Sequence, residues 1–274
     1  MSKTTSAPAV CLTIAGSDSG GGAGIQADLH TFAAFGVHGV SVVTAVTAQN
    51  TQSVSAVMTL PSRLLRAQFK AVAGDFPVAA AKIGMLGNPS VVRVVAELLA
   101  EADEFPVILD PVLVATTGAA LGSNGVATAI RRYLFARSAL ITPNVPEAAE
   151  LLGISIRSST DFSAAAQALV DAGAKAILLK GAHLEGPVVR DLLVKDGRES
   201  WFEHPRVAVE GHGTGCTLSA AIAANLARGL DLKEAVGSAI AYVQRALAAS
   251  YRPGRGPVSV LGRGLAAPQT DGSG

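Results

Sequence analysis

The 274-residue chain is 49% hydrophobic and 16% charged, so it has enough apolar material for a sizeable core and is not intrinsically disordered. Its 22 lysine and arginine residues balance 21 acidic residues, and no basic run occurs, so we expect no nucleic-acid partner. It has no uncharged apolar stretch of about 18 residues, so we expect no membrane span. Two distant cysteines, Cys11 and Cys216, argue against a disulfide scaffold and favour a reducing compartment, so we expect a cytoplasmic protein.

The first apolar run, residues 9–15, follows Lys3 and superficially resembles a signal peptide. It is short, and Gly16-Ser17-Asp18-Ser19-Gly20 follows it in place of a small-residue cleavage site. We therefore expect this run to be the first strand of the core.

Short apolar runs alternate with helix-length amphipathic segments up to about residue 180. This alternation predicts an α/β fold, with a central, mostly parallel sheet and helices on both faces. We expect strands at Val10–Ala15, Gly39–Val46, Ala79–Ile83, Val107–Asp110, Ala139–Thr142 and Ala176–Lys180. We expect helices at Gly24–Phe35, Pro61–Ala73, Pro89–Glu101, Gly125–Phe135, Pro146–Leu152 and Asp161–Ala172.

A different pattern follows residue 180. Val188–Val194 and Glu199–Phe202 flank an Asp196-Gly197 turn signal, which predicts a β-hairpin. Two helices are expected after it, at Cys216–Arg228 and Asp231–Ala249, and then a flexible tail at residues 264–274. Because there is no linker and no internal repeat, we predict one domain over residues 1–274, with a core at about residues 9–262.

Polar residues stand at the carboxyl ends of the expected strands, where open α/β sheets bind ligands. They are Ser17 and Asp18, Gln49 and Asn50, Asp110, Asn144, and Lys180. Each could be a simple cap or turn residue, but their shared position predicts a common cleft.

Two carboxylates could hold a hydrated Mg²⁺ at this edge. Asp110 ends a buried strand, and Glu147 follows the next strand in an Asn144-x-x-Glu147 pattern. Magnesium in proteins usually takes one or two carboxylates together with substrate phosphates. The alternative for Glu147 is an acid in the first turn of a helix, favoured by the helix dipole.

The segment His212-Gly213-Thr214-Gly215-Cys216 leads directly into an expected helix. Small residues at a helix start expose backbone N–H groups, which together with the helix dipole favour a phosphate. We expect the same field to favour a thiolate at Cys216. The alternative is a glycine-rich turn before a buried helix.

Common nucleotide and metal motifs are missing. No Gly-Lys dipeptide occurs, which excludes a Walker A loop, and residues 16–24 lack the strict GxGxxG spacing. The five histidines show no metal-ligand spacing.

The chain resembles the hydroxymethylpyrimidine/phosphomethylpyrimidine kinases of thiamin biosynthesis, which belong to the ribokinase-like superfamily. The resemblance is collinear from about residue 9 to about 262. It is carried by Gly16–Asp28, Thr44–Thr51, Lys82–Leu86, Asp110–Val112, Thr142–Ala148, Leu179–Gly181 and His212–Cys216. It implies a ribokinase-like α/β domain that uses ATP and Mg²⁺ and is usually a homodimer.

The resemblance also implies roles for individual residues. Gly213 and Gly215 would form an anion hole, Lys180 would neutralise the transferred phosphate, and Cys216 would occupy the position of the superfamily's aspartate base. Asp110 and Glu147 would organise Mg²⁺, and Thr214 and Asn144 would bind the nucleotide. The pyrimidine pocket would be lined by Ala23, Gln49, Met85 and Val112, with Asp28 near it.

Two departures from the family pattern alter the charge near the phosphates. A lid at Pro111–Gly122 has Thr116 where the family commonly has lysine, and Glu210-Gly211 precede His212 where the family often has Asn-Thr. Pyridoxal or pyridoxine kinase activity, and a non-catalytic ligand-binding relative, stay open as alternatives.

Overall fold

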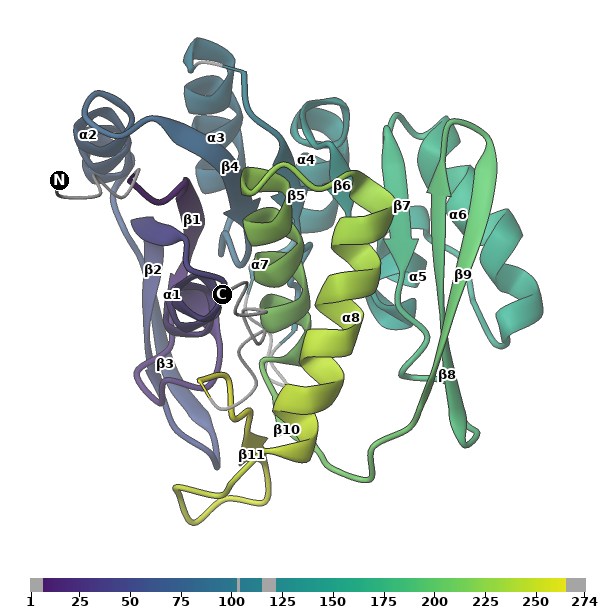
Figure 1. Ribbon diagram of the computed structural model, residues 1–274. Coiled ribbons are helices and arrows are strands. Elements are labelled where there is room, and N and C mark those ends of the chain that lie inside the picture. The colour runs from purple at the N-terminus through teal and green to yellow at the C-terminus, as the bar shows by residue number, and fades with distance from the viewer. Residues whose placement is uncertain (1–6, 103, 115–121, 265–274) are drawn as a thin grey trace, which may run out of the picture.

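The computed structural model describes residues 7–102, 104–114 and 122–264. These residues form one nine-stranded sheet in the order β3-β2-β1-β4-β5-β6-β7-β8-β9 (Figure 1). The central strands are parallel: β1 (Val10–Ser17), β2 (His38–Gln49), β4 (Val78–Ile83), β5 (Val107–Leu109), β6 (Leu140–Ile141) and β7 (Ala176–Leu179). The edges are antiparallel, with β3 (Val54–Thr59) on one side and the hairpin of β8 (Val188–Lys195) and β9 (Arg198–Pro205) on the other.

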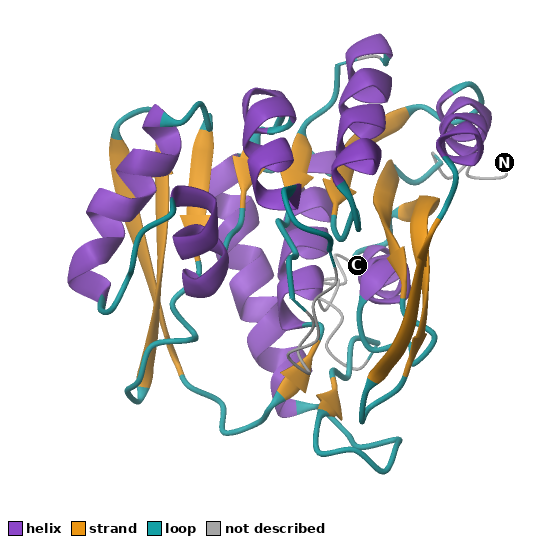
Figure 2. Cartoon of the chain, turned by 180° about the vertical axis from the view of Figure 1, so that it is seen from behind, coloured by secondary structure: helices purple, strands orange, loops and turns teal. Residues whose placement is uncertain are grey.

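Helices cover both faces of the sheet. One face is covered by α1 (Gly24–Ala34), α7 (Thr214–Ala227) and α8 (Leu232–Ala248). The opposite face, in front in Figure 2, is covered by α2 (Ser62–Ala73), α3 (Pro89–Glu101), α4 (Val126–Tyr133), α5 (Val145–Leu152) and α6 (Phe162–Asp171). Short 3₁₀ helices lie at Phe135–Arg137 and Ser159–Asp161.

The parallel strands are apolar throughout because both of their faces are buried. One row of side chains faces α2–α6 and pairs across five strands: Ile14, Ile83, Leu109, Ile141 and Ile177. The residues that alternate with them, such as Cys11 and Ile108, belong to the core beneath α1, α7 and α8. This register aligns the carboxyl ends of the parallel strands along one edge.

The predicted α/β architecture with a mostly parallel sheet is confirmed, and each predicted strand and helix is present with small shifts of its ends. The sequence analysis missed β3, an edge strand with mostly exposed side chains and no clear apolar period. It also missed the parallel pair of β10 (Gly211–His212) and β11 (Ser259–Val260), which is too short to leave a sequence pattern. In the described part of the chain, no helix is long and apolar enough to span a membrane. Most of the predicted lid and tail, residues 115–121 and 265–274, lies outside the described residues.

Candidate active site

A cavity of about 640 Å³ lies at the carboxyl edge of the parallel strands. It is lined by the loop before α1, the residues that follow β4, β5 and β7, and the first turn of α7. Residues of α8 and of the segment after β9 complete it. Its volume is in the range typical of small-molecule sites, and it lies where the polar strand-end residues were predicted to meet.

The first turn of α7 faces this cavity. The helix begins at Thr214 after Gly213, whose φ of 79° is readily adopted only by glycine. The first N–H groups of a helix have no partner within it, so they and the helix dipole favour an anion. A Cβ on Gly215 would lie 3.2 Å from Lys180 Nζ and 3.6 Å from Asp110 Oδ2, so glycine keeps the turn open toward both groups.

Arg263 fixes this turn to the loop before α1. Its side chain is buried, and the guanidinium donates to Gly22 O at 2.6 Å and to Thr217 Oγ1 at 2.9 Å. Thr217 Oγ1 donates to Gly213 O at 2.7 Å. One guanidinium therefore joins the glycine-containing loop before α1 to the glycine-containing start of α7.

Lys180 lies between two carboxylates beside this turn. Its Nζ is 3.0 Å from Asp110 Oδ1 and 3.9 Å from Glu147 Oε2. Burial lowers the pKa of Lys180, but the two carboxylates raise it by more, so the ammonium stays charged. Burial raises the pKa of Glu147 to about 7, against the opposing effect of Lys180. The cluster therefore places one cation and two carboxyl groups beside the first turn of α7.

Glu147 also lies in the first turn of a helix, which was the alternative predicted for it. Its Oε2 accepts a hydrogen bond from Asn144 N, and Asn144 Oδ1 accepts one from Glu147 N, both at 2.8 Å. This reciprocal capping box starts α5. Asn144 lines the cavity, but its side-chain oxygen is engaged in the cap.

The carboxylates suit a magnesium ion that is shared with a phosphate substrate. Asp110 Oδ2 is buried and has no hydrogen-bond partner, so a hard oxygen donor is available there. Among the described residues no group of three or more His, Cys, Asp or Glu side chains could hold a metal by itself. Asp110 and Glu147 thus fit Mg²⁺ only together with oxygens of a bound phosphate.

The environment of Cys216 contradicts the expectation of a favoured thiolate. Burial raises the pKa of its thiol to about 11, and the opposing effect of Lys82 and of a backbone hydrogen bond from Gly24 is smaller. Cys216 lines the cavity, as predicted, but its Sγ is protonated at neutral pH.

Asp28 does not lie in the predicted pocket. It is fully buried, and its Oδ2 accepts from Lys82 Nζ at 2.9 Å and from Thr13 Oγ1 at 2.6 Å. Lys82 lies directly behind the cavity wall, and its side chain is as inaccessible as that of Asp28. Burial lowers the pKa of Lys82, but the nearby negative groups, chiefly Asp28, together raise it by more, so the ammonium stays charged. Asp28 therefore balances a buried charge next to the cavity.

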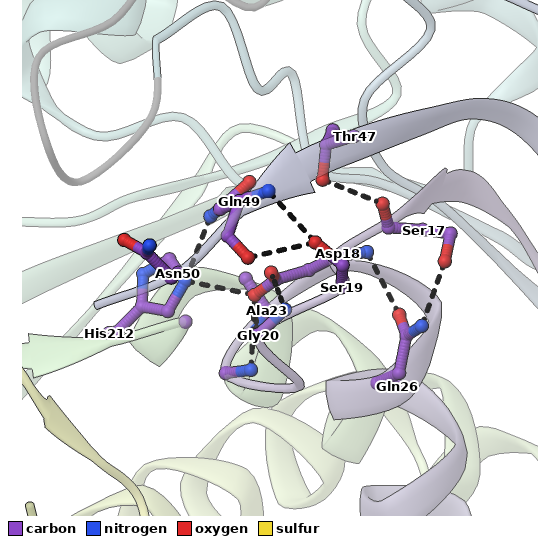
Figure 3. A network of polar contacts seen from close by, with 12 residues as sticks. Ser17, Asp18, Ser19, Gly20, Ala23, Gln26, Thr47, Gln49, Asn50 and His212 are labelled. Carbon is purple, nitrogen blue, oxygen red and sulfur yellow. Dashed lines mark hydrogen bonds and ion pairs between the residues drawn. The ribbon is translucent and has the colours of Figure 1, made fainter. Parts of the chain in front are cut away.

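Gln49 belongs to a polar network with His212 and Asp18, and all three residues line the cavity (Figure 3). Its side-chain amide lies 3.1 Å from His212 Nε2, which is 3.0 Å from Asp18 Oδ2. Asp18 accepts backbone hydrogen bonds from Gly20, Gly22 and Ala23. The loop after β1 is thereby tied to the segment before α7.

The other predicted pocket residues are brought together as expected. Ala23, Met85, Val112 and Thr214 all line the same cavity as Gln49 and Cys216. Thr116 lies outside the described residues. Whether these side chains contact a substrate stays a prediction.

The chain was compared with protein families and solved structures. The family model described as phosphomethylpyrimidine kinase matches residues 18–261. The hydroxymethylpyrimidine/phosphomethylpyrimidine kinase of Streptomyces coelicolor is 45% identical over 250 residues, which cover 91% of this chain and 92% of that protein. The chain belongs to the phosphomethylpyrimidine kinase family. The family resemblance predicted from the sequence is thereby confirmed.

Two solved structures extend the comparison to the fold. The phosphomethylpyrimidine kinase of Clostridium difficile matches with a TM-score of 0.78 and 39% identity, covering 87% of this chain and 99% of that one. The pyridoxal kinase of Staphylococcus aureus in complex with AMP-PCP and pyridoxal matches with a TM-score of 0.85 and 31% identity over 94% of both chains. The predicted ribokinase-like fold of this family member is confirmed.

Sequence reasoning missed two residues of this phosphomethylpyrimidine kinase family site. Lys82 interrupts the buried run Ala79–Ile83, and a lysine is almost never fully buried unless it is paired. That interruption of an apolar run is the sequence feature that could have identified Lys82. His212 was noted only as the start of a glycine-rich segment, and nothing in the sequence pairs it with Asp18.

Proposed function

We propose that this chain transfers the γ-phosphoryl group of ATP to the hydroxymethyl group of hydroxymethylpyrimidine, and then phosphorylates the monophosphate to the diphosphate, in thiamin biosynthesis. One observation carries the proposal: Lys180, Asp110 and the open first turn of α7 line the same cavity as Gln49. Family membership supports the choice of acceptor.

Phosphoryl transfer requires positioning and charge neutralisation more than covalent chemistry. Lys180 and the N–H groups of the first turn of α7 would bind the equatorial oxygens of the transferred group. Gly215 would let the phosphate approach the backbone, and Gly213 would support this anion hole by letting the chain turn tightly against Gly22 before α7. Thr214 and Asn144 would contact the nucleotide from the same edge.

Asp110 and Glu147 would hold Mg²⁺ jointly with the nucleotide phosphates. When bound, the ion would neutralise phosphate charge and orient the γ-phosphoryl group. Asp110 Oδ2 supports this role because it is a buried carboxylate oxygen without a protein partner.

The pyrimidine ring would lie against Ala23, Met85 and Val112, with Gln49 at its polar edge. Cys216 would orient the acceptor hydroxyl. Its raised pKa favours orientation over proton abstraction, because little thiolate is present at neutral pH.

Purified protein incubated with ATP, Mg²⁺ and hydroxymethylpyrimidine tests the proposal by ADP release and mass spectrometry of the product. We expect a monophosphate first and a diphosphate later. A parallel reaction with pyridoxal separates the vitamin B6 alternative, and tight binding of either ring without turnover would indicate a non-catalytic relative. No ADP above background with hydroxymethylpyrimidine would contradict the proposal.

We also propose that the chain forms a homodimer in the cytoplasm. Val46 of β2 and Met58 of the edge strand β3 form a cross-strand pair and are 38% and 61% exposed, so they offer an apolar surface to a second copy. Light scattering should then give twice the chain mass of 27.6 kDa, and Met58→Lys should give the single mass. The free cysteines Cys11 and Cys216 support a reducing compartment, which fractionation of cells would test.

A further inference from the structure

His212 lies between a carboxylate and a carboxamide. Its Nε2 is 3.0 Å from Asp18 Oδ2 and 3.1 Å from Gln49 Nε2, and both His212 and Asp18 are buried (Figure 3). One ring nitrogen therefore contacts two neighbours whose hydrogen-bonding needs differ.

Asp18 can only accept hydrogen bonds. Its Oδ1 accepts from Gly20 N at 2.8 Å, and its Oδ2 accepts from Gly22 N at 3.0 Å and from Ala23 N at 2.8 Å. Burial alone would raise the pKa of Asp18, but His212 and these backbone donors lower it below its ordinary value. The carboxylate is charged, so the nitrogen that faces it must carry a proton.

A protonated Nε2 constrains the Gln49 carboxamide. The Nε2 atoms of Gln49 and His212 face each other as two donors, which is unfavourable. The oxygen and nitrogen ends of a carboxamide have nearly the same shape, so a half-turn of the group places the oxygen against His212 at no steric cost. The His212 N–H is then shared between Asp18 and the Gln49 oxygen, as in other three-centre hydrogen bonds.

We propose that Asp18 and His212 are positioning residues that turn the Gln49 carboxamide so that its NH₂ group is the end presented to the acceptor ring. Gln49 lines the cavity, so this NH₂ group is available to a ligand. The site then selects a ring that offers a hydrogen-bond acceptor at this edge, such as a ring nitrogen. The amide oxygen faces His212 in this orientation, so it is not the end that meets the ring. The identity of the ring rests on the proposed function.

The protonation of His212 can be measured without turnover. In protein labelled with ¹⁵N in its histidine rings, long-range ¹⁵N–¹H spectra distinguish a protonated from an unprotonated Nε2. The chain has five histidines, and the signals missing from His212→Gln identify those of His212. We expect a protonated Nε2 at neutral pH. An unprotonated Nε2 would overturn the proposal, even if the chain phosphorylates a different acceptor.

Kinetics test whether this proton positions Gln49. Gln49→Leu should lower kcat/KM for hydroxymethylpyrimidine about ten- to a hundredfold, because a ring acceptor is left unpaired. His212→Leu should lower it about tenfold, through the KM of the acceptor and not the KM of ATP, because Gln49 then loses its preferred orientation. His212→Gln, whose terminal amide can still donate, should recover most of this loss.

The double variant decides between positioning and simple support. If His212 acts through Gln49, adding His212→Leu to Gln49→Leu should change kcat/KM less than twofold, as expected for coupled residues. His204→Leu is the matched control, because His204 also lines the cavity and contacts a buried carboxylate, Asp191, at 3.2 Å. It should leave the acceptor KM unchanged. Multiplicative losses in the double variant, or an equal effect of His204→Leu on the acceptor KM, would refute the positioning role.

Discussion

Two buried lysine–aspartate pairs interact with Cys216, and their surroundings differ. Lys82 and Asp28 are 2.9 Å apart, and both side chains are completely inaccessible. Lys180 and Asp110 are 3.0 Å apart, but the Lys180 side chain is 11% exposed, and Glu147 and the open turn of α7 lie beside it. The same two residue types thus occur once in an enclosed pair and once at a cavity surface.

The difference distinguishes a lysine whose charge stabilises the fold from a lysine whose charge can take part in catalysis. An enclosed pair cannot exchange partners, so Lys82 can act on a substrate only through its fixed electric field. The Lys180 ammonium can move from Asp110 toward a phosphate, because both groups border the cavity. Substitutions in the first pair should therefore affect folding most, and substitutions in the second should affect turnover most.

Lys82→Met should have the largest effect, on stability. It leaves the Asp28 carboxylate buried and uncompensated, which costs about 3–5 kcal/mol of unfolding free energy. Urea unfolding followed by circular dichroism measures the loss. Adding Asp28→Leu should restore most of the stability, since the second charge is then removed. A single-variant loss below about 1 kcal/mol would show that water reaches this pair.

Lys180→Met should instead reduce catalysis. Loss of one preorganised donor to the transferred phosphoryl group should lower kcat about 10²–10³-fold. The unfolding free energy should fall less than in Lys82→Met, because the Lys180 side chain is 11% exposed at the cavity whereas Lys82 is completely inaccessible. Lys180→Arg, which retains the charge, should keep more activity. The comparison of the two pairs fails if Lys180→Met destabilises the fold as much as Lys82→Met does.

Asp110→Asn should alter the magnesium requirement. It keeps the size of the side chain and removes one charged ligand, so the Mg²⁺ concentration for half-maximal rate should rise about tenfold, or ~1.4 kcal/mol. Asp231→Asn is the control, because Asp231 caps α8 and asparagine caps helices equally well. An unchanged magnesium requirement with a lower melting temperature would assign Asp110 a purely structural role.

Cys216→Ala should have the smallest effect, about tenfold on kcat, which is less than the 10²–10⁴-fold contribution of a general base. The wild-type kcat should be flat from about pH 8 to about pH 9, because Glu147, with a pKa of about 7, is then ionised and the raised pKa of about 11 keeps the Cys216 thiol protonated. A tenfold rise in kcat per pH unit that disappears in Cys216→Ala would instead identify the thiolate as the base.

The sequence predicted the fold well because its main determinants are local. Continuous apolar runs such as Val107–Asp110 indicate strands buried on both faces, and Pro89 and Pro146 lie in the first turns of α3 and α5. The edge strand Val54–Thr59 was missed because it is exposed and pairs only with β2. Its strand conformation depends on pairing with β2 more than on its own pattern of apolar residues.

The site was predictable where function depends on position along a strand. Asp110 and Lys180 were identified because they follow apolar runs, and their contact confirms that these strand ends meet. The pairing of Asp28 with Lys82 and the raised pKa of Cys216 were not predictable, because both depend on burial by distant segments. Strand order and solvent access are properties of the folded chain.

The contact between Arg263 and Gly22 spans 241 residues of the chain. Domains emerge from the ribosome with the N-terminal part first, at about 5–20 residues per second. The loop before α1 is therefore synthesised before most of the domain, yet the guanidinium that fixes it to α7 follows every helix and strand that the structure describes. A nascent chain that has completed its entire sheet still lacks this link, so the pocket takes its final shape only when synthesis of the domain is nearly finished.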